Sequence, residues 1–192
     1  MMKRFVTFVL VAAVALCAMP AFAAQKKGAT PDEKKLISME YARGVEAINQ
    51  HQWNAAVASL SKVIDNPATP KDLLCNSYEN RGTAMANKKM ENEAIADFSK
   101  ALEINPDMEG ALYNRARAYA KINKHAEAVA DLTKAIGLAK ADVILGSYYK
   151  NRGVSYLAME KRDLAKADFI KAKQVYPKTK LSDEAKALVK GN

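Results

Sequence analysis

Residues 93–106, with the sequence EAIADFSKALEINP, decide the fold of this chain of 192 residues. Apolar side chains recur there at Ala94, Phe98, Ala101 and Leu102. This is the i, i+4, i+7, i+8 spacing that places residues on one face of an α-helix. Pro106 closes the stretch, because proline cannot continue a helix interior. The stretch therefore predicts an amphipathic helix with one buried stripe.

The same pattern occurs four times along the chain. It is centred on Ala56, Ala94, Ala128 and Ala165, which are 38, 34 and 37 residues apart. A large apolar residue follows each alanine four positions later (Leu60, Phe98, Leu132, Phe169), and a smaller one follows three positions further on (Val63, Ala101, Ala135, Ala172). Twelve positions before each alanine stands a glycine or alanine: Gly44, Gly82, Ala116 and Gly153. A fixed period of this size indicates a repeat array.

Each unit reads as a helical hairpin. Gly82 and Ala94 are small enough to let the axes of two helices approach, and Phe98 fills the space beside them. Such a hairpin cannot bury its faces alone and must stack on its neighbours. An apolar content of 49%, with eight glycines and six prolines, agrees with an all-α chain.

The motifs Asn80-Arg81-Gly82 and Glu93–Phe98, and the run from Lys100 to Pro106, make the chain similar to the tetratricopeptide repeat family. The resemblance covers residues 37–179, with repeats at 37–70, 75–108, 109–142 and 146–179. It implies a right-handed all-α solenoid of about four antiparallel helix pairs, with a concave groove lined by the first helix of each pair. Residues 182–190 are expected to form a C-terminal capping helix, since Leu181 and Ala185 lie on an apolar stripe opposite a charged face.

The N-terminus predicts a cleaved secretory signal peptide, residues 1–23. Lys3 and Arg4 precede an uncharged run, and Ala21-Phe22-Ala23 has the small-x-small pattern of a signal-peptidase site. We expect a linker at 24–30, a repeat domain at 31–192, and a periplasmic or secreted protein with no stable membrane span after cleavage. A retained N-terminal anchor is the alternative. Thr30 and Thr69, each followed by proline, are expected to cap helices.

The charge of the chain is positive, +9 overall and 9 − 2 = +7 after loss of residues 1–23. This bias favours anionic partners or a solvated basic surface. Because the lysines are spread along the array and export is expected, nucleic acid is not an expected partner. Cys75 is the one cysteine left after cleavage, so no disulfide can form within the mature chain. It is expected either to pack as a small apolar group or to link two molecules.

No catalytic, metal-binding or cofactor-binding constellation is visible, so the chain is not expected to be an enzyme. His51 and His125 have no local partner at metal-ligand spacing. The carboxylates Asp97, Asp131 and Asp168 recur at one repeat position, and arginines recur just before the small residue of each first helix: Arg43, Arg81, Arg115 and Arg152. Because both kinds of residue recur at fixed positions of the repeat, the sequence favours structural pairing between the aspartates and the arginines.

The strongest candidate site is the asparagine series Asn80, Asn114 and Asn151, one on each of three first helices. Because an amide both donates and accepts hydrogen bonds, stacked asparagines could hold the backbone of an extended peptide. This is similar to the asparagine ladder of some tetratricopeptide grooves. The alternative is that these amides only brace neighbouring repeats. The carboxylate clamp of other family members is absent, since among its positions only Asn80 matches.

The sequence therefore predicts a non-enzymatic scaffold that binds a protein or peptide partner in its concave groove in the cell envelope. Besides the asparagines, the residues expected to line the groove are Tyr41, Glu79, Tyr113, Arg117, Lys121 and Lys150. The alternative function is a self-assembling structural component of an envelope complex, in which case the chain would form a homo-oligomer.

Overall fold

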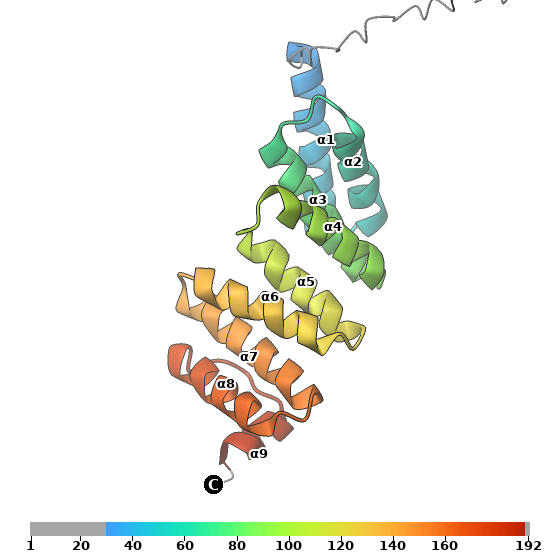
Figure 1. Cartoon of the computed structure of the whole chain (residues 1–192). Coiled ribbons are helices and arrows are strands. Elements are labelled where there is room, and N and C mark those ends of the chain that lie inside the picture. The colour runs from blue at the N-terminus through green and yellow to red at the C-terminus, as the bar shows by residue number, and fades with distance from the viewer. Residues whose placement is uncertain (1–29, 191–192) are drawn as a thin grey trace, which may run out of the picture.

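The computed structural model describes residues 30–190, which form nine α-helices and no strand (Figure 1). The helices are α1 (Pro31–Asn49), α2 (Trp53–Asp65), α3 (Lys71–Asn87), α4 (Glu91–Ile104), α5 (Glu109–Lys121), α6 (His125–Leu138), α7 (Asp142–Ala158), α8 (Arg162–Val175) and α9 (Asp183–Lys190). The predicted signal peptide, residues 1–23, lies outside the described residues. The first eight helices pair as α1/α2, α3/α4, α5/α6 and α7/α8, and the pairs stack into one elongated array. The predicted all-α solenoid is confirmed.

The two threonines expected to cap helices behave differently. The Thr30 hydroxyl accepts a hydrogen bond from the backbone N–H of Glu33 at 3.2 Å, and the Glu33 carboxylate accepts one from the backbone N–H of Thr30 at 2.7 Å. This reciprocal pair starts α1 as predicted. Thr69 does not cap α3, and that prediction is wrong. Its hydroxyl donates instead to the carbonyl oxygen of Val63 at 2.6 Å, which fixes the loop after α2.

The core follows the repeated pattern. The four central alanines are fully buried, as are Phe98 and Phe169. A Cβ atom added to Gly82 would lie 2.8 Å from the ring of Phe98, and one added to Gly153 would lie 2.7 Å from the ring of Phe169. Real Cβ atoms do not approach so closely, so glycine is needed where the two helices of these hairpins meet. The predicted close approach of the helix axes is confirmed.

Three arginines join the repeats to one another. Arg81, Arg115 and Arg152 each form two hydrogen bonds, of 2.7–2.8 Å, with the aspartate sixteen residues later on the second helix of the same hairpin (Asp97, Asp131, Asp168). The remaining guanidinium nitrogen donates at 2.9–3.0 Å to a hydroxyl on the second helix of the preceding hairpin (Ser61, Ser99, Thr133). Each arginine therefore ties three helices together, and the predicted arginine–aspartate pairing is confirmed at three repeats.

The first repeat departs from this arrangement. Ser59 stands where the other repeats have aspartate, and Arg43 pairs instead with Glu40 on its own helix at 2.9 Å. Lys62 on α2 also reaches Glu40, at 3.2 Å. Arg43 therefore binds a carboxylate of its own helix, that of Glu40, instead of one on the second helix of the hairpin. Among the described residues no hairpin precedes Arg43, so it has no hydroxyl there to contact.

The array curves toward its first helices. α1 contacts α3, α3 contacts α5, and α5 contacts α7, whereas successive second helices hardly touch. Because the first helices are the closer set, they form the concave side of the array. At the C-terminal end, Ala185 of α9 and Leu181, just before that helix, pack with Ala165 and Phe169 of α8, which covers the last hairpin as the sequence predicts.

Candidate functional site

The nine predicted site residues all lie on the first helices of the hairpins. Tyr41 is on α1, Glu79 and Asn80 on α3, Tyr113, Asn114, Arg117 and Lys121 on α5, and Lys150 and Asn151 on α7. The repeat spacing of about 34 residues puts equivalent positions of successive first helices side by side. The concave side therefore carries a continuous row of tyrosine, amide and charged groups.

Two of the three asparagines bind tyrosines across repeat boundaries. The Asn80 amide nitrogen donates to the Tyr41 hydroxyl at 3.2 Å, and the Asn151 amide nitrogen donates to the Tyr113 hydroxyl at 3.3 Å. Asn151 also donates to the carbonyl oxygen of Ser147 at 2.8 Å. These donors brace neighbouring first helices, which is the alternative that the sequence left open.

Asn114 is different from the other two asparagines. Asn80 and Asn151 each bond a tyrosine on the preceding repeat, but the same position on the repeat before Asn114 holds Glu79. Among residues 30–190 the Asn114 amide makes no hydrogen bond. The α3–α5 junction is therefore the place on the concave side where an amide of the asparagine series has no hydrogen-bond partner within the described residues.

Glu79 is held at the same junction. Its side chain is half-buried beside the start of α5, and a Cβ atom at Gly110 would collide with its carboxylate. Burial raises the pKa of Glu79, because a carboxylate loses hydration there. Within the described part of the chain this carboxylate pairs with no cation.

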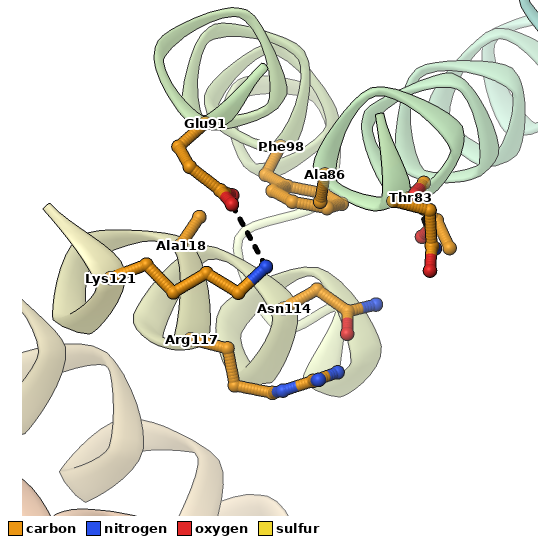
Figure 2. A pocket seen from close by; sticks show the side chains of 9 residues that line it. Thr83, Ala86, Glu91, Phe98, Asn114, Arg117, Ala118 and Lys121 are labelled. Carbon is orange, nitrogen blue, oxygen red and sulfur yellow. Dashed lines mark hydrogen bonds and ion pairs between the residues drawn. The ribbon is translucent and has the colours of Figure 1, made fainter. Parts of the chain in front are cut away.

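A pocket opens next to Asn114 (Figure 2). It is lined by Thr83, Ala86 and Asn87 from α3, by Glu91 and Phe98 from α4, and by Asn114, Arg117, Ala118 and Lys121 from α5. Figure 2 shows α3 on one side and α5 on the other, with Glu91 reaching down toward Lys121. The fully buried ring of Phe98 closes the inner end.

The pocket contains both signs of charge. Lys121 forms an ion pair with Oε1 of Glu91 at 2.8 Å, and this bond links the end of one repeat's first helix to the start of the preceding repeat's second helix. Oε2 of Glu91 is buried and has no hydrogen-bond partner. The Arg117 guanidinium lies 5.6 Å from the centre of the Tyr113 ring, in the range of a cation–π contact, and its side chain is exposed.

The structure thus brings together three of the nine predicted residues, Asn114, Arg117 and Lys121, in one pocket. Sequence reasoning missed Glu91. It is the first residue of α4, where the equivalent residues of the other repeats are Trp53, His125 and Arg162, so no recurrent chemistry marks it. The detectable signal is its spacing of thirty residues from Lys121, slightly less than one repeat.

Cys75 is buried and belongs to the core. Its thiol contacts the carbonyl oxygen of Ala101 at 3.3 Å and the sulfur of Met108 at 3.2 Å, and burial raises its pKa. This position favours packing over a link between two molecules. Among residues 30–190 no group of three histidine, cysteine or acidic side chains is arranged to hold a metal ion. No helix in the same range is long and apolar enough to cross a membrane.

Stacked helical hairpins with a concave row of polar side chains define a helical-repeat solenoid. The second and third hairpins are tetratricopeptide repeats, since the model of that family matches residues 76–108 and 109–142. These two matches cover the hairpins on either side of the pocket. This confirms the family resemblance that the sequence shows at Asn80-Arg81-Gly82 and Glu93–Phe98.

Curated proteins similar to this chain share the repeats over part of their length. Serine/threonine-protein phosphatase T of Trypanosoma brucei brucei is 32% identical over 96 residues, covering 50% of this chain and 19% of the phosphatase. Tetratricopeptide repeat protein 36 of Caenorhabditis elegans is 36% identical over 86 residues, covering 45% of this chain and 48% of that protein. The chain therefore spans between a fifth and a half of these relatives.

Solved structures share the fold. MamA superposes with a TM-score of 0.65 at 22% identity, over 74% of this chain and 79% of that chain. The first tetratricopeptide domain of Spaghetti (RPAP3), solved with a bound HSP90 peptide, superposes with a TM-score of 0.55 at 23% identity, over 60% of this chain and 90% of that one.

Proposed function

We propose that the protein is a non-enzymatic scaffold that binds an extended peptide segment of a partner protein along its concave side, centred on the α3–α5 junction. The observation that carries this proposal is the Asn114 amide. It lies at the mouth of a polar pocket and makes no hydrogen bond among the described residues, while Asn80 and Asn151 are occupied by tyrosines. A carboxamide can donate to and accept from one peptide unit without reading its side chain.

The fold supports the same proposal. The similar domain of Spaghetti (RPAP3) carries a peptide, and its fold is shared over most of that domain. In the present chain the clamp residues of carboxylate-binding members are absent, so the expected ligand is an internal extended segment rather than a C-terminal carboxylate.

A crosslinking experiment in intact cells tests this function. A photoreactive amino acid in place of Arg117, which is exposed beside the pocket, should form adducts with a protein partner, and mass spectrometry should locate the adduct in an extended segment. The same group in place of Ala96, exposed on α4 away from the concave side, is the matched control. Equal adduct formation from both positions would reject the concave side as the binding surface.

The asparagines provide a quantitative test with the captured partner segment. Replacing Asn80, Asn114 and Asn151 together by alanine should weaken binding at least tenfold, or about 1.4 kcal/mol. Asn114→Ala alone should weaken binding without altering thermal stability, because it removes no bond within the protein. Unchanged affinity in a folded triple variant would refute the proposal.

The cell envelope is the compartment that we propose for this function, since residues 1–23 have the order of a charged start, an apolar run and an alanine-rich cleavage site. The intact mass of the protein purified from the periplasm or medium tests it. A mass that retains Met1 to Ala23 would contradict cleavage.

Self-assembly is a second candidate function, favoured by one observation at the N-terminal end of the described array. Met39 is 44% exposed on α1, although its counterparts Ser77, Ala111 and Tyr148 are buried. Analytical ultracentrifugation at micromolar concentration separates the two functions. A monomer unaffected by Met39→Glu would count against self-assembly.

A further inference from the structure

The pocket between α3 and α5 contains a hydrogen-bond acceptor that the fold does not use. Oε1 of Glu91 pairs with Lys121 at 2.8 Å, but Oε2 is buried and has no donor. The side chain as a whole is 13% exposed and belongs to the pocket lining, so the orphan oxygen is shielded from bulk solvent. A buried acceptor without a donor is costly, so a ligand that brings an N–H group to this oxygen gains more than one that does not.

The charges around that oxygen exclude two kinds of ligand side chain. An aspartate or glutamate would place a second carboxylate next to Glu91, where like charges repel. A lysine or arginine would have to approach Lys121, which is paired with Glu91, and Arg117, which lines the same pocket. Burial strengthens the first repulsion, because the side chain of Glu91 is largely removed from water and the local dielectric constant there is lower.

A neutral carboxamide can bond the carboxylate and the cations of the pocket at once. Its NH2 group can donate to Oε2 of Glu91 once a rotation of the carboxylate exposes that oxygen, and its carbonyl oxygen can accept from Lys121 or Arg117. The rest of the pocket wall suits a polar neutral group, since Thr83, Asn87 and Asn114 contribute a hydroxyl and two amides. The alanines Ala86 and Ala118 leave room between the helices and offer contact to a methylene stem.

We propose that this pocket selects a glutamine or asparagine side chain of the bound peptide, with Glu91 and Lys121 reading the two ends of its amide. The inference rests on the proposed peptide-binding function and adds a specificity to it. Asn114 holds the backbone of the ligand at the mouth of the pocket, and the ion pair inside decides which side chain can enter.

Phage display of random linear decapeptides against the immobilised repeat protein tests the proposal without a known partner. Wild type should enrich glutamine or asparagine at one position. A synthetic peptide from the enriched set should bind at least tenfold more tightly than its versions with glutamate or lysine at that position, as measured by fluorescence anisotropy.

Two opposite substitutions should change the preference in opposite directions. Glu91→Gln removes the carboxylate and leaves Arg117 and Lys121, so the preferred side chain should become acidic. Lys121→Gln leaves the carboxylate of Glu91 without its partner, so the preference should move toward lysine or arginine. Glu93→Gln and Lys124→Gln change the same charges on exposed residues outside the pocket and should leave the preference as in wild type.

These outcomes distinguish a failure of the pocket specificity from a failure of the proposed peptide-binding function. Enriched peptides without a favoured amide, or a preference that neither variant alters, would overturn the pocket specificity while leaving peptide binding in place. If wild type enriches no peptide beyond what Asn114→Ala enriches, both proposals fail. Circular dichroism confirms that each variant is folded, and each of the two pocket variants tests the inference by itself.

Discussion

Gly82 on α3 lies against the ring of Phe98 on α4 so closely that a Cβ atom would be 2.8 Å from Cε1 of the ring. The fourth repeat pairs Gly153 with Phe169 in the same way. In the third repeat the small residue is Ala116, and its partner at the phenylalanine position is the smaller Leu132. In the first repeat a Cβ atom at Gly44 would lie 2.6 Å from Cγ of Leu60, so this close contact joins residues sixteen positions apart in the first, second and fourth hairpins.

Gly82→Ala should destabilise the protein by about 1–3 kcal/mol, because the added methyl group must displace the Phe98 ring. Urea unfolding followed by circular dichroism measures this. Gly137→Ala is the control: a Cβ atom there would meet nothing within 4 Å, so the change should be neutral or stabilise α6 by up to about 1 kcal/mol. Equal effects at both positions would contradict the packing.

Phe98→Ala should cost on the order of 3–5 kcal/mol, since it leaves a cavity in a fully buried site. Repeats contact only their neighbours, so the loss should appear first in hydrogen exchange of the second and third hairpins. Full protection of those hairpins in the variant would show that Phe98 does not support them.

Asp131→Ala should cost roughly 1.5–3 kcal/mol, because the half-buried Arg115 loses both hydrogen bonds to its carboxylate. Glu103→Ala provides a matched comparison, since it breaks an ion pair with Lys100 in which both side chains are mostly exposed. That change should cost less than about 0.5 kcal/mol. Chemical denaturation of the two variants should therefore give clearly different midpoints.

Glu79→Gln should raise the melting temperature at neutral pH, because burial raises the pKa of this carboxyl and its ionised form is disfavoured in the folded state. Wild type should recover the difference as the pH falls through the raised pKa of Glu79, and the two proteins should converge below the pKa of an exposed glutamate. Glu103→Gln, at an exposed position, should lack this pH-dependent gain. A gain that grows at acidic pH would have the wrong sign.

The fold could be predicted from the sequence because its determinants recur. Ala94 and Phe98 have counterparts in every repeat, so each position is supported four times. The turns between helices were harder to predict from the sequence. His51, Lys89, Asn123 and Glu160 adopt left-handed backbone conformations, with φ of 57°, 62°, 60° and 59°. Glycine, the usual signal for such a turn, is absent at all four places.

The candidate site was predicted in part, since it depends on where the repeats differ. Asn114 was found from its series, but the sequence could not show that tyrosines occupy the amides of Asn80 and Asn151. Glu91 was missed because its partner Lys121 lies on another repeat. The proposed site therefore lies where the repeat pattern is broken, and only the packed structure brings these residues together.

The hydroxyl series Ser61, Ser99 and Thr133 stops at α8, where the corresponding residue is Ile170. A hairpin appended after α8 would find no oxygen to receive its arginine. A duplicate of α5/α6 inserted beside the original would instead regenerate every such contact, because Arg115 can bind a hydroxyl on its predecessor and Thr133 can receive the arginine of its successor. Internal duplication would therefore preserve this hydrogen-bond network, whereas the arginine of a hairpin added after α8 would lack one of its three partners.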